Sequence, residues 1–137
     1  MTIALVRATE WLESYVQAWT TYDAAAIGAL FSVDVVYHPN PFVEPLHGRD
    51  AVVAFWLNDR DTPGTYSASY ASFLTDGAVV MAAGQSRYYA DAGQTELRTV
   101  FENVFLLRFD ADSACIEYRE WYMERPTHTI EAEAPAP

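Results

Sequence analysis

A glutamate among large aromatic residues is the most distinctive chemical feature of this sequence. It is Glu120, within the segment EYREWYMERP at residues 117–126. Side chains alternate between the two faces of a β-strand, so Tyr118, Glu120 and Tyr122 would share one face. Burial among rings disfavours the charged form of a carboxylate and raises its pKa, which would let Glu120 act as a general acid or base near neutral pH. The alternative is a structural carboxylate that accepts hydrogen bonds from neighbouring Tyr, Trp or Asn side chains.

His38 is a second candidate for proton transfer, because histidine titrates near neutral pH. It lies in a segment predicted to be a strand, and alternation directs its side chain to the face opposite Tyr37. His38, Glu44 and His47 are also residue types that bind metal ions, but their spacing matches no compact site, so no metal is expected. The sequence has no glycine-rich phosphate loop and no nucleophile motif, and we expect no cofactor.

The composition predicts one soluble domain. The chain has 137 residues, of which 51% are hydrophobic and 15% aromatic, enough for a single packed core. No apolar run is long enough to cross a membrane, and a formal net charge of -11 repels phosphate backbones and anionic membrane surfaces. We therefore expect neither nucleic acid nor a membrane as a partner. Because Cys115 is the only cysteine and no secretory signal is visible, a cytoplasmic location is the default expectation.

The first structural element is predicted to be a long amphipathic helix. Its apolar residues recur at spacings of one, three and four positions, which places them on one stripe of a helix. Such a stripe must be buried against another element, so this helix is expected to pack against the rest of the fold. The residues of the stripe are Trp11, Leu12, Tyr15, Val16, Trp19 and Tyr22.

A second helix, a short strand and a third helix are predicted to follow. Asp23 is a suitable N-cap for the second helix, within YDAAAIGALFS. The strand lies in DVVYHPNPF and is expected to end near His38, because the two prolines remove backbone donors. The third helix is expected to begin after Gly48. The buried side of the second helix is predicted to consist of Ile27, Leu30 and Phe31.

Four further strands are predicted in the second half of the chain. The first two lie in TYSASYASFLTDGAVVMAAGQSRYY and are joined at an Asp-Gly hairpin signal. The other two lie in ELRTVFENVFLLRFDADSACIEYREWYME and turn at DADS. The result is an α+β fold with three helices on one face of an antiparallel sheet. We expect one domain over residues 1–126 and a disordered tail over residues 127–137, which lacks an apolar period.

The order of these segments resembles that of the nuclear-transport-factor-2-like superfamily and, within it, the SnoaL-like domains. The resemblance covers about residues 6–125 and is carried by YVQAWTTYDAAAIGALFSVDVVYHPNPF, by GRDAVVAFW and by NVFLLRFD leading to YREWYM. It implies a cone, in which a curved antiparallel sheet wraps around the long first helix and encloses an apolar cavity, and a homodimer formed through the sheet. Members include ketosteroid isomerases, polyketide cyclases, epoxide hydrolases, dehydratases and proteins that only bind, so the fold leaves the function open.

Two catalytic patterns of the superfamily do not fit this sequence. When it is overlaid on a ketosteroid isomerase, the catalytic Asp falls at Pro39 and the second acid near Phe105, and only the Tyr has a counterpart, Tyr15. The two inward acids and inward Arg of the epoxide hydrolases are not recreated either. Polyketide cyclases use a single inward acid, and for that role the overlay offers Glu120.

Two functions therefore stay open. One is an enzyme of isomerase, cyclase or dehydratase type that uses Glu120 for proton transfer on an apolar small molecule. The other is a non-catalytic ligand-binding or dimeric interaction domain of the same fold, for which Arg119, Trp121 and Met123 would form an outward surface. In either case the resemblance predicts that the ligand contacts Tyr15, Trp19, Tyr37, Phe101, Asn103, Phe105, Tyr118 and Tyr122.

Overall fold

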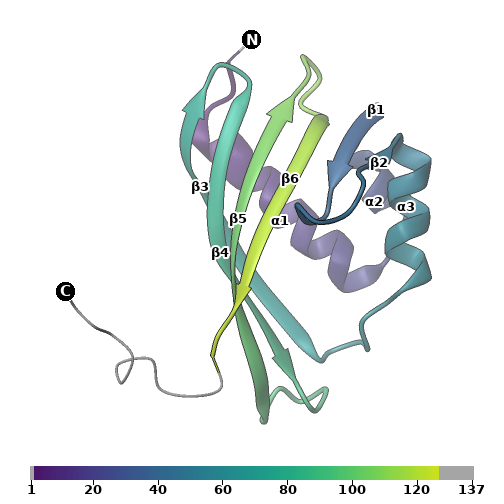
Figure 1. Cartoon of the computed structure of the whole chain (residues 1–137), viewed down its shortest axis with the longest axis vertical. Helices are drawn as coiled ribbons and strands as arrows, with labels where there is room; N and C mark the ends of the chain where they lie inside the picture. The colour runs from purple at the N-terminus through teal and green to yellow at the C-terminus, as the bar shows by residue number, and fades with distance from the viewer. Residues whose placement is uncertain (1, 127–137) are drawn as a thin grey trace, which may run out of the picture.

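The structure, a computed structural model, describes residues 2–126 and places its helices on one face of a six-stranded sheet (Figure 1). The elements follow in the order α1, α2, β1, β2, α3, β3, β4, β5 and β6. This is the α+β arrangement that the sequence predicts. The predicted disordered tail, residues 127–137, lies outside the described residues. Within the described part, no helix has the length and apolar character needed to cross a membrane.

Helix α1, Leu5–Thr21, is the long amphipathic helix expected from the spacing of its apolar residues. Trp11, Leu12 and Tyr15 are on its buried side. The helix ends at Thr21, and its C-cap Tyr22 has a φ of 51°, a left-handed conformation that often closes helices. In Figure 1 α1 runs diagonally behind the long strands, so its apolar stripe faces the sheet.

Helix α2, Ala24–Ala29, is shorter than the sequence predicts. The Asp23 carboxylate caps its start and accepts a hydrogen bond from the backbone N–H of Ala25 at 3.3 Å, as expected. Phe31, which was predicted to lie in this helix, instead begins strand β1, Phe31–His38. The prediction was wrong because tertiary pairing overrides local periodicity: Phe31 lies opposite Cys115 in the sheet and is fully buried.

Between β1 and the third helix the chain adds one short strand to the sheet. This strand, β2, Leu46–His47, pairs antiparallel with β1 and is too short to show any hydrophobic period in the sequence. Helix α3, Arg49–Asn58, begins after Gly48, as predicted. Gly48 has a φ of 94°, a conformation that favours glycine and redirects the chain from β2 into α3.

The four long strands form the two predicted hairpins. The Asp-Gly signal marks the first turn, in which Gly77 has a φ of 62°. In the second turn the carboxylate of Asp110 accepts hydrogen bonds from two backbone N–H groups. The strands are β3, Tyr66–Asp76; β4, Val79–Tyr89; β5, Leu97–Phe109; and β6, Cys115–Glu124.

The strand order is β2-β1-β6-β5-β4-β3, and every pair is antiparallel except β1 and β6. The parallel pair departs from the all-antiparallel sheet that was expected. A hairpin forces its strands to be antiparallel, but β1 and β6 are separated by most of the chain and are under no such constraint. The pairing places Tyr37 directly beside Tyr118.

Aromatic rings fill the space between α1 and the concave face of the sheet. The ring of Tyr118, which is fully buried, stacks on Tyr37 with centroids 4.3 Å apart and on Tyr15 with centroids 5.9 Å apart. Phe105 and Phe31 meet the same ring edge-on. Interlocked rings in these orientations pack densely, so they form a firm layer beneath the open end of the cone.

Candidate functional site

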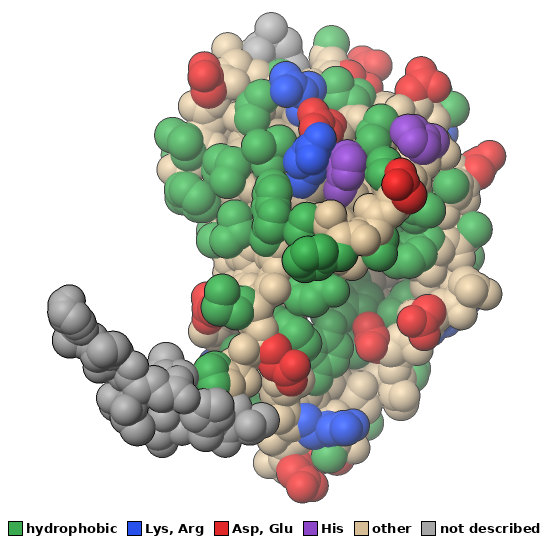
Figure 2. All heavy atoms as spheres, viewed as in Figure 1, with side chains coloured by type: hydrophobic (Ala, Val, Ile, Leu, Met, Phe, Trp, Pro, Cys, Tyr) green, Lys and Arg blue, Asp and Glu red, His purple; other side chains and the backbone are tan. Residues whose placement is uncertain are grey.

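A cavity of about 500 Å³ opens above this aromatic layer. Its volume lies in the range of small-molecule sites. Figure 2 shows a recess on this face that is walled mostly by hydrophobic side chains, with acidic side chains beside it. Because the sheet curves around α1, side chains from helices, loop and strands converge on the same space. They are Tyr15, Trp19 and Tyr22 from α1 and its C-cap, Tyr37 from β1, Phe55 and Trp56 from α3, Asp59 and Asp61 from the loop after α3, Tyr70 from β3, Ser86 and Tyr88 from β4, Phe101 and Asn103 from β5, and Glu120 and Tyr122 from β6.

Two protein donors hold the carboxylate of Glu120 at the cavity wall. The Tyr118 hydroxyl donates to Oε1 at 2.6 Å, and the Asn103 side-chain amide donates to Oε2 at 2.8 Å. The hydroxyls of Tyr15 and Tyr118 are also hydrogen-bonded, at 2.8 Å. Since the proton of Tyr118 is directed to Glu120, Tyr15 is the donor in that pair.

A second series of hydrogen bonds reaches Glu120 through Asn103. Ser86 donates to the Asn103 side-chain oxygen at 2.8 Å, and the hydroxyls of Tyr70 and Ser86 are hydrogen-bonded to each other. Because Ser86 has a single hydroxyl proton, Tyr70 must be the donor to it. Both series therefore direct every donor toward one carboxylate, which is the orientation that an anion requires.

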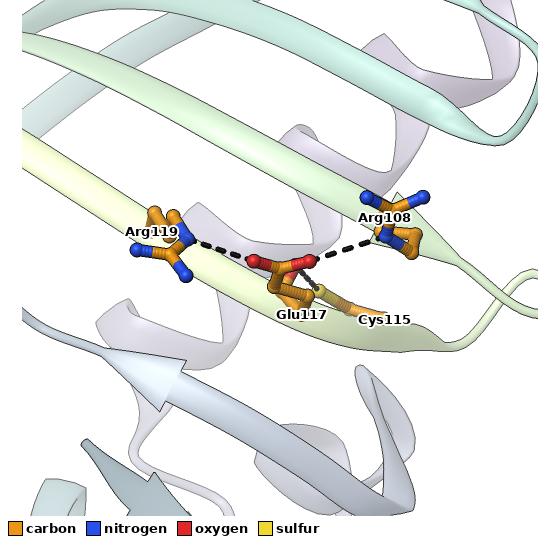
Figure 3. Close-up of polar contacts among 4 residues, drawn as sticks. All are labelled: Arg108, Cys115, Glu117 and Arg119. Carbon is orange, nitrogen blue, oxygen red and sulfur yellow. Dashed lines mark hydrogen bonds and ion pairs between the residues drawn. The ribbon is translucent and has the colours of Figure 1, made fainter.

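The environment of Glu120 makes it a weaker acid than an exposed glutamate. Burial raises the pKa of Glu120 above its ordinary value of 4.5, and the bonds from its two donors offset this only in part. Glu117, three residues earlier, shows the contrast on the other face of β6 (Figure 3). It accepts hydrogen bonds from Arg119 Nε at 2.7 Å and from Arg108 Nε at 3.1 Å, and the bond to Arg119 is the main cause that lowers its pKa. The pKa values of these two glutamates of β6 are thus shifted in opposite directions.

Removing the hydroxyl of Tyr118 is expected to raise the pKa of Glu120 further, because that hydroxyl stabilises the charged form. The Tyr118→Phe variant should also lose about 1.5–3 kcal/mol of unfolding free energy, the usual worth of a hydrogen bond to a charged group. A carboxyl ¹³C NMR titration measures the first effect and urea denaturation the second. Tyr70→Phe, at the outer end of the other series, is the control and should move the pKa of Glu120 much less. An unchanged or lower pKa in Tyr118→Phe would contradict the assignment.

Two tyrosine hydroxyls on the cavity wall can donate to a ligand oxygen. Trp56 Nε1 donates to the Tyr37 hydroxyl at 3.1 Å, which fixes that group in place. Burial and the charge of Glu120 raise the pKa of Tyr37. Burial, followed by the charges of Asp61 and Glu120, raises the pKa of Tyr88. Both phenols therefore stay protonated and remain hydrogen-bond donors at neutral pH.

Asp61 is held firmly at the rim of the cavity. Its Oδ2 accepts hydrogen bonds from Trp19 Nε1 at 3.0 Å and from the Tyr22 hydroxyl at 3.3 Å. Its backbone N–H donates to the same hydroxyl at 2.8 Å. The Tyr66 hydroxyl donates to the backbone oxygen of Trp19 at 2.6 Å and ties this cluster to β3. The loop after α3 is thereby joined to the C-terminal end of α1.

Most side chains that the sequence predicts to face a ligand do line the cavity, and two do not. Phe105 and Tyr118 are fully buried beneath it and are not part of its wall. Both face the concave side of the sheet, as alternation requires, but α1 packs directly on that part of the sheet and leaves no space there. The predicted residues that line the cavity are Tyr15, Trp19, Tyr37, Phe101, Asn103, Glu120 and Tyr122.

His38 does not line the cavity, which corrects its candidacy as a base in this site. Strand alternation directs its side chain away from the face of Tyr37. Burial and the nearby charge of Arg119 lower its pKa, with a smaller opposite effect from Glu117. Within residues 2–126, no three His, Cys, Asp or Glu side chains are grouped as a metal site would require.

Several cavity residues were not identified from the sequence. Ser86 and Tyr88 share a face of β4 by alternation, which is a signal once the position of β4 in the sheet is known. Trp56 is four residues after the buried Val52 in α3, so helical spacing could have found it. Asp59 and Asp61 lie in a loop without any periodic pattern, and nothing in the local sequence points to the cavity.

The sequence itself places the chain in a known family. Residues 12–118, well over half of the chain, match the family described as the SnoaL-like domain. The chain belongs to the SnoaL-like domain family. This confirms the resemblance inferred from the order of the sequence segments. No curated protein matches the sequence of this SnoaL-like domain.

Solved structures confirm the fold of the SnoaL-like domain. An LEH-like epoxide hydrolase from M.tuberculosis superposes with a TM-score of 0.62 at 17% identity, over 87% of this chain and 84% of the other. A protein assigned as a ketosteroid isomerase, from Kribbella flavida DSM 17836, superposes with a TM-score of 0.64 at 16% identity, over 96% of this chain and 90% of the other. At such low identities the similarity establishes the nuclear-transport-factor-2-like fold and leaves the chemistry to the cavity residues.

Proposed function

We propose that this SnoaL-like domain binds an apolar small molecule in its cavity and catalyses proton transfer on it, with Glu120 as the acid–base group. The observation that supports this most directly is a carboxylate at the wall of an aromatic cavity, with a raised pKa and no ion pair among the described residues. Perturbed carboxylates in clefts are frequent at catalytic sites.

In the proposed reaction Glu120 removes a proton from a carbon beside a carbonyl group of the ligand. The electron pair of the broken C–H bond moves to the carbonyl oxygen, which gains negative charge. The hydroxyl of Tyr37 or Tyr88 donates a hydrogen bond to that oxygen and lowers the barrier. Glu120 then returns the proton to a carbon of the same ligand, so the carboxylate is regenerated and atoms balance.

The hydrogen-bond network adjusts Glu120 to this role. Oε1 and Oε2 each accept one hydrogen bond from the protein, so each keeps a second lone pair for the ligand proton. The opposing effects of burial and of these donors give a base that is stronger than an ordinary carboxylate and is still able to ionise.

The second candidate function is ligand binding without chemistry. It is favoured by the same two hydrogen bonds, because a buried carboxylate with both oxygens paired is also what a structural group would show. In that case the network serves to fix the curvature of β5 and β6 around the cavity.

Hydrogen exchange on a bound ketone separates the two functions. A panel of alicyclic and polycyclic ketones, together with any compound recovered from the purified protein by mass spectrometry, is incubated with the protein in D₂O. NMR then follows deuterium incorporation beside the carbonyl group. Proton transfer predicts incorporation faster than in buffer for ligands that bind. Tight binding with incorporation at the buffer rate would exclude catalysis and favour the binding function.

The resemblance also implies a homodimer, and we propose the outer face of β5 and β6 as its interface. Exposed apolar side chains gather there: Trp121 is 40%, Val104 37% and Met123 74% exposed. Trp121 lies directly opposite Val104 in the sheet. Light scattering tests this interface, since Trp121→Glu should lower the measured mass toward that of a monomer, and an unchanged dimer mass would argue against it.

A further inference from the structure

The charged groups of the cavity wall are all of one sign. Asp59, Asp61 and Glu120 line it, whereas no Lys, Arg or His of the described residues does. None of the three carboxylates takes part in an ion pair within residues 2–126. A neutral ligand would gain no charge–charge attraction from these carboxylates, whereas a cation would.

The basic side chain that neighbours both aspartates in the sequence is directed elsewhere. Arg60 lies between the two aspartates in sequence, but its guanidinium is over the ring of Tyr22, 5.5 Å from the centroid. Its Nε donates to the backbone oxygen of Leu57 at 3.4 Å. Arg60 therefore moderates the field at the outside of the rim without pairing with Asp59 or Asp61.

Aromatic rings form a continuous wall between the rim and Glu120. Trp19, whose Nε1 donates to Asp61, is 6.0 Å from Tyr88 between ring centroids. Tyr88 meets Phe101 edge-on at 5.6 Å, and Phe101 meets Tyr122 edge-on at 5.7 Å. The faces of such rings carry partial negative charge and attract cations. Rings and carboxylates along this wall thus favour the same kind of ligand group.

The acid at the rim is already arranged to receive a charge. Asp61 uses Oδ2 for both of its side-chain hydrogen bonds, to Trp19 and Tyr22. Its other oxygen, Oδ1, has no hydrogen-bond partner among residues 2–126. A carboxylate fixed by two donors loses little conformational freedom when it binds a cation.

We propose that the ligand is an organic cation: an apolar body that carries an ammonium group. The ammonium group lies against Asp61 and Asp59 beside the rings of Trp19 and Tyr88, and the uncharged part of the ligand extends toward Glu120. This inference rests on the proposed function for the location of the reacting end, but the recognition of the charge does not depend on catalysis.

Binding of three compounds with the same apolar body tests the inference. Phenylbutylamine, phenylbutanol and phenylpentanoate are cationic, neutral and anionic at neutral pH, and calorimetry gives their dissociation constants. We expect the amine to bind about tenfold more tightly than the alcohol, since ion pairs and cation–π contacts add at a partly desolvated site. The acid is expected not to bind measurably.

The double variant Asp59→Asn, Asp61→Asn should reduce the preference for the amine to about twofold or less. Asparagine keeps a side-chain oxygen that can accept from Trp19 and Tyr22, so the rim should retain its shape. The matched control is the double variant Glu102→Gln, Asp112→Asn, which removes the same two charges from exposed positions on β5 and in the turn after it and should leave the preference unchanged. Thermal melts establish that all variants are folded.

The inference is wrong if the wild-type protein binds the alcohol as tightly as the amine. It is also wrong if the amine fails to bind at millimolar concentration, or if its preference survives both rim substitutions. These outcomes concern binding alone, whereas deuterium incorporation on ketones concerns Glu120. A protein that prefers the amine but catalyses no exchange would support the cationic ligand and exclude the proposed catalysis. A protein that catalyses exchange but shows no preference for the amine would support the catalysis and exclude the cationic ligand.

Discussion

Replacing Glu120 with glutamine is expected to slow proton transfer by about 10²–10⁴-fold, the usual contribution of a general acid–base group. Glutamine has nearly the same shape, and its side-chain oxygen can still accept one of the bonds from Tyr118 and Asn103. It cannot accept a proton from the ligand. Deuterium incorporation into a bound ketone is the measurement, and ligand affinity should change by no more than about tenfold.

Glu102→Gln is the matched control for this experiment. Glu102 lies on β5, is exposed, and accepts a hydrogen bond from Gln85. The substitution removes the same charge without touching the cavity wall, so the exchange rate should stay at the wild-type level. Equal rates for Glu120→Gln and wild type would rule out Glu120 as the acid–base group.

The Glu120→Gln variant should also change how the free energy of unfolding depends on pH. The pKa of Glu120 in the folded state is raised above 4.5, its ordinary value in the unfolded chain, so the folded state binds this proton more tightly. Its contribution to stability is complete below pH 4.5 and is lost as the pH rises through the raised pKa. Glu117, with a lowered pKa, acts in the opposite sense and loses its contribution as the pH falls. Urea denaturation at a series of pH values gives the free energy of unfolding of wild type and of Glu120→Gln. The difference between the two pH curves isolates the contribution of Glu120.

The largest loss of stability is expected from Gly84→Ala. Gly84 lies on β4, between Tyr70 of β3 and Asn103 of β5. A Cβ atom at Gly84 would overlap the backbone oxygen of Ser69 and would lie 2.7 Å from the Tyr70 Cα. Backbone atoms cannot rotate away, so β3 would have to move. We expect a loss of about 3 kcal/mol or more, a large part of the stability of a domain of this size.

The damage should extend to the site, because Tyr70 is the outer donor of the series that ends at Glu120. Thermal and urea denaturation measure the loss of stability. Gly28→Ala in α2 is the control, since a Cβ there meets only side-chain atoms of Arg49 and Val53, at ordinary distances of 3.5 Å and 3.8 Å. Alanine in place of a helical glycine should stabilise by about 0.5–1 kcal/mol. Similar melting temperatures for the two variants would show that the close approach of β3 at Gly84 is not needed.

The types of the elements could be predicted from the sequence because their signals are local. The stripe of α1, the cap at Asp23, the glycine before α3 and the Asp-Gly turn each lie within a few residues and have a direct physical meaning. What could not be predicted depends on long-range pairing. Phe31 belongs to a strand only because Cys115 lies beside it, and the parallel pairing of β1 with β6 leaves no mark on either segment.

For the candidate site, too, the sequence predicts what depends on local pattern and not what depends on tertiary packing. Alternation along β6 correctly directs Glu120 to the concave side, and its two donors agree with the residue types expected around it. How deep each inward residue lies is set by α1, which covers Phe105 and leaves Asn103 at the wall. Asp61 reaches the cavity through its contacts with α1, so only the folded chain reveals it.

The position of β6 has a consequence for biogenesis. Of the strands within residues 2–126 it is the last to be synthesised, yet it lies between β1 and β5 in the middle of the sheet. Until it emerges from the ribosome, a nascent chain holds two partial sheets with open edges, which are templates for wrong pairing. The strand that closes this gap also delivers Glu120, so completion of the sheet and appearance of the acid are one late event. A messenger RNA truncated before the codons of β6 would therefore encode an aggregation-prone product rather than a partly active one.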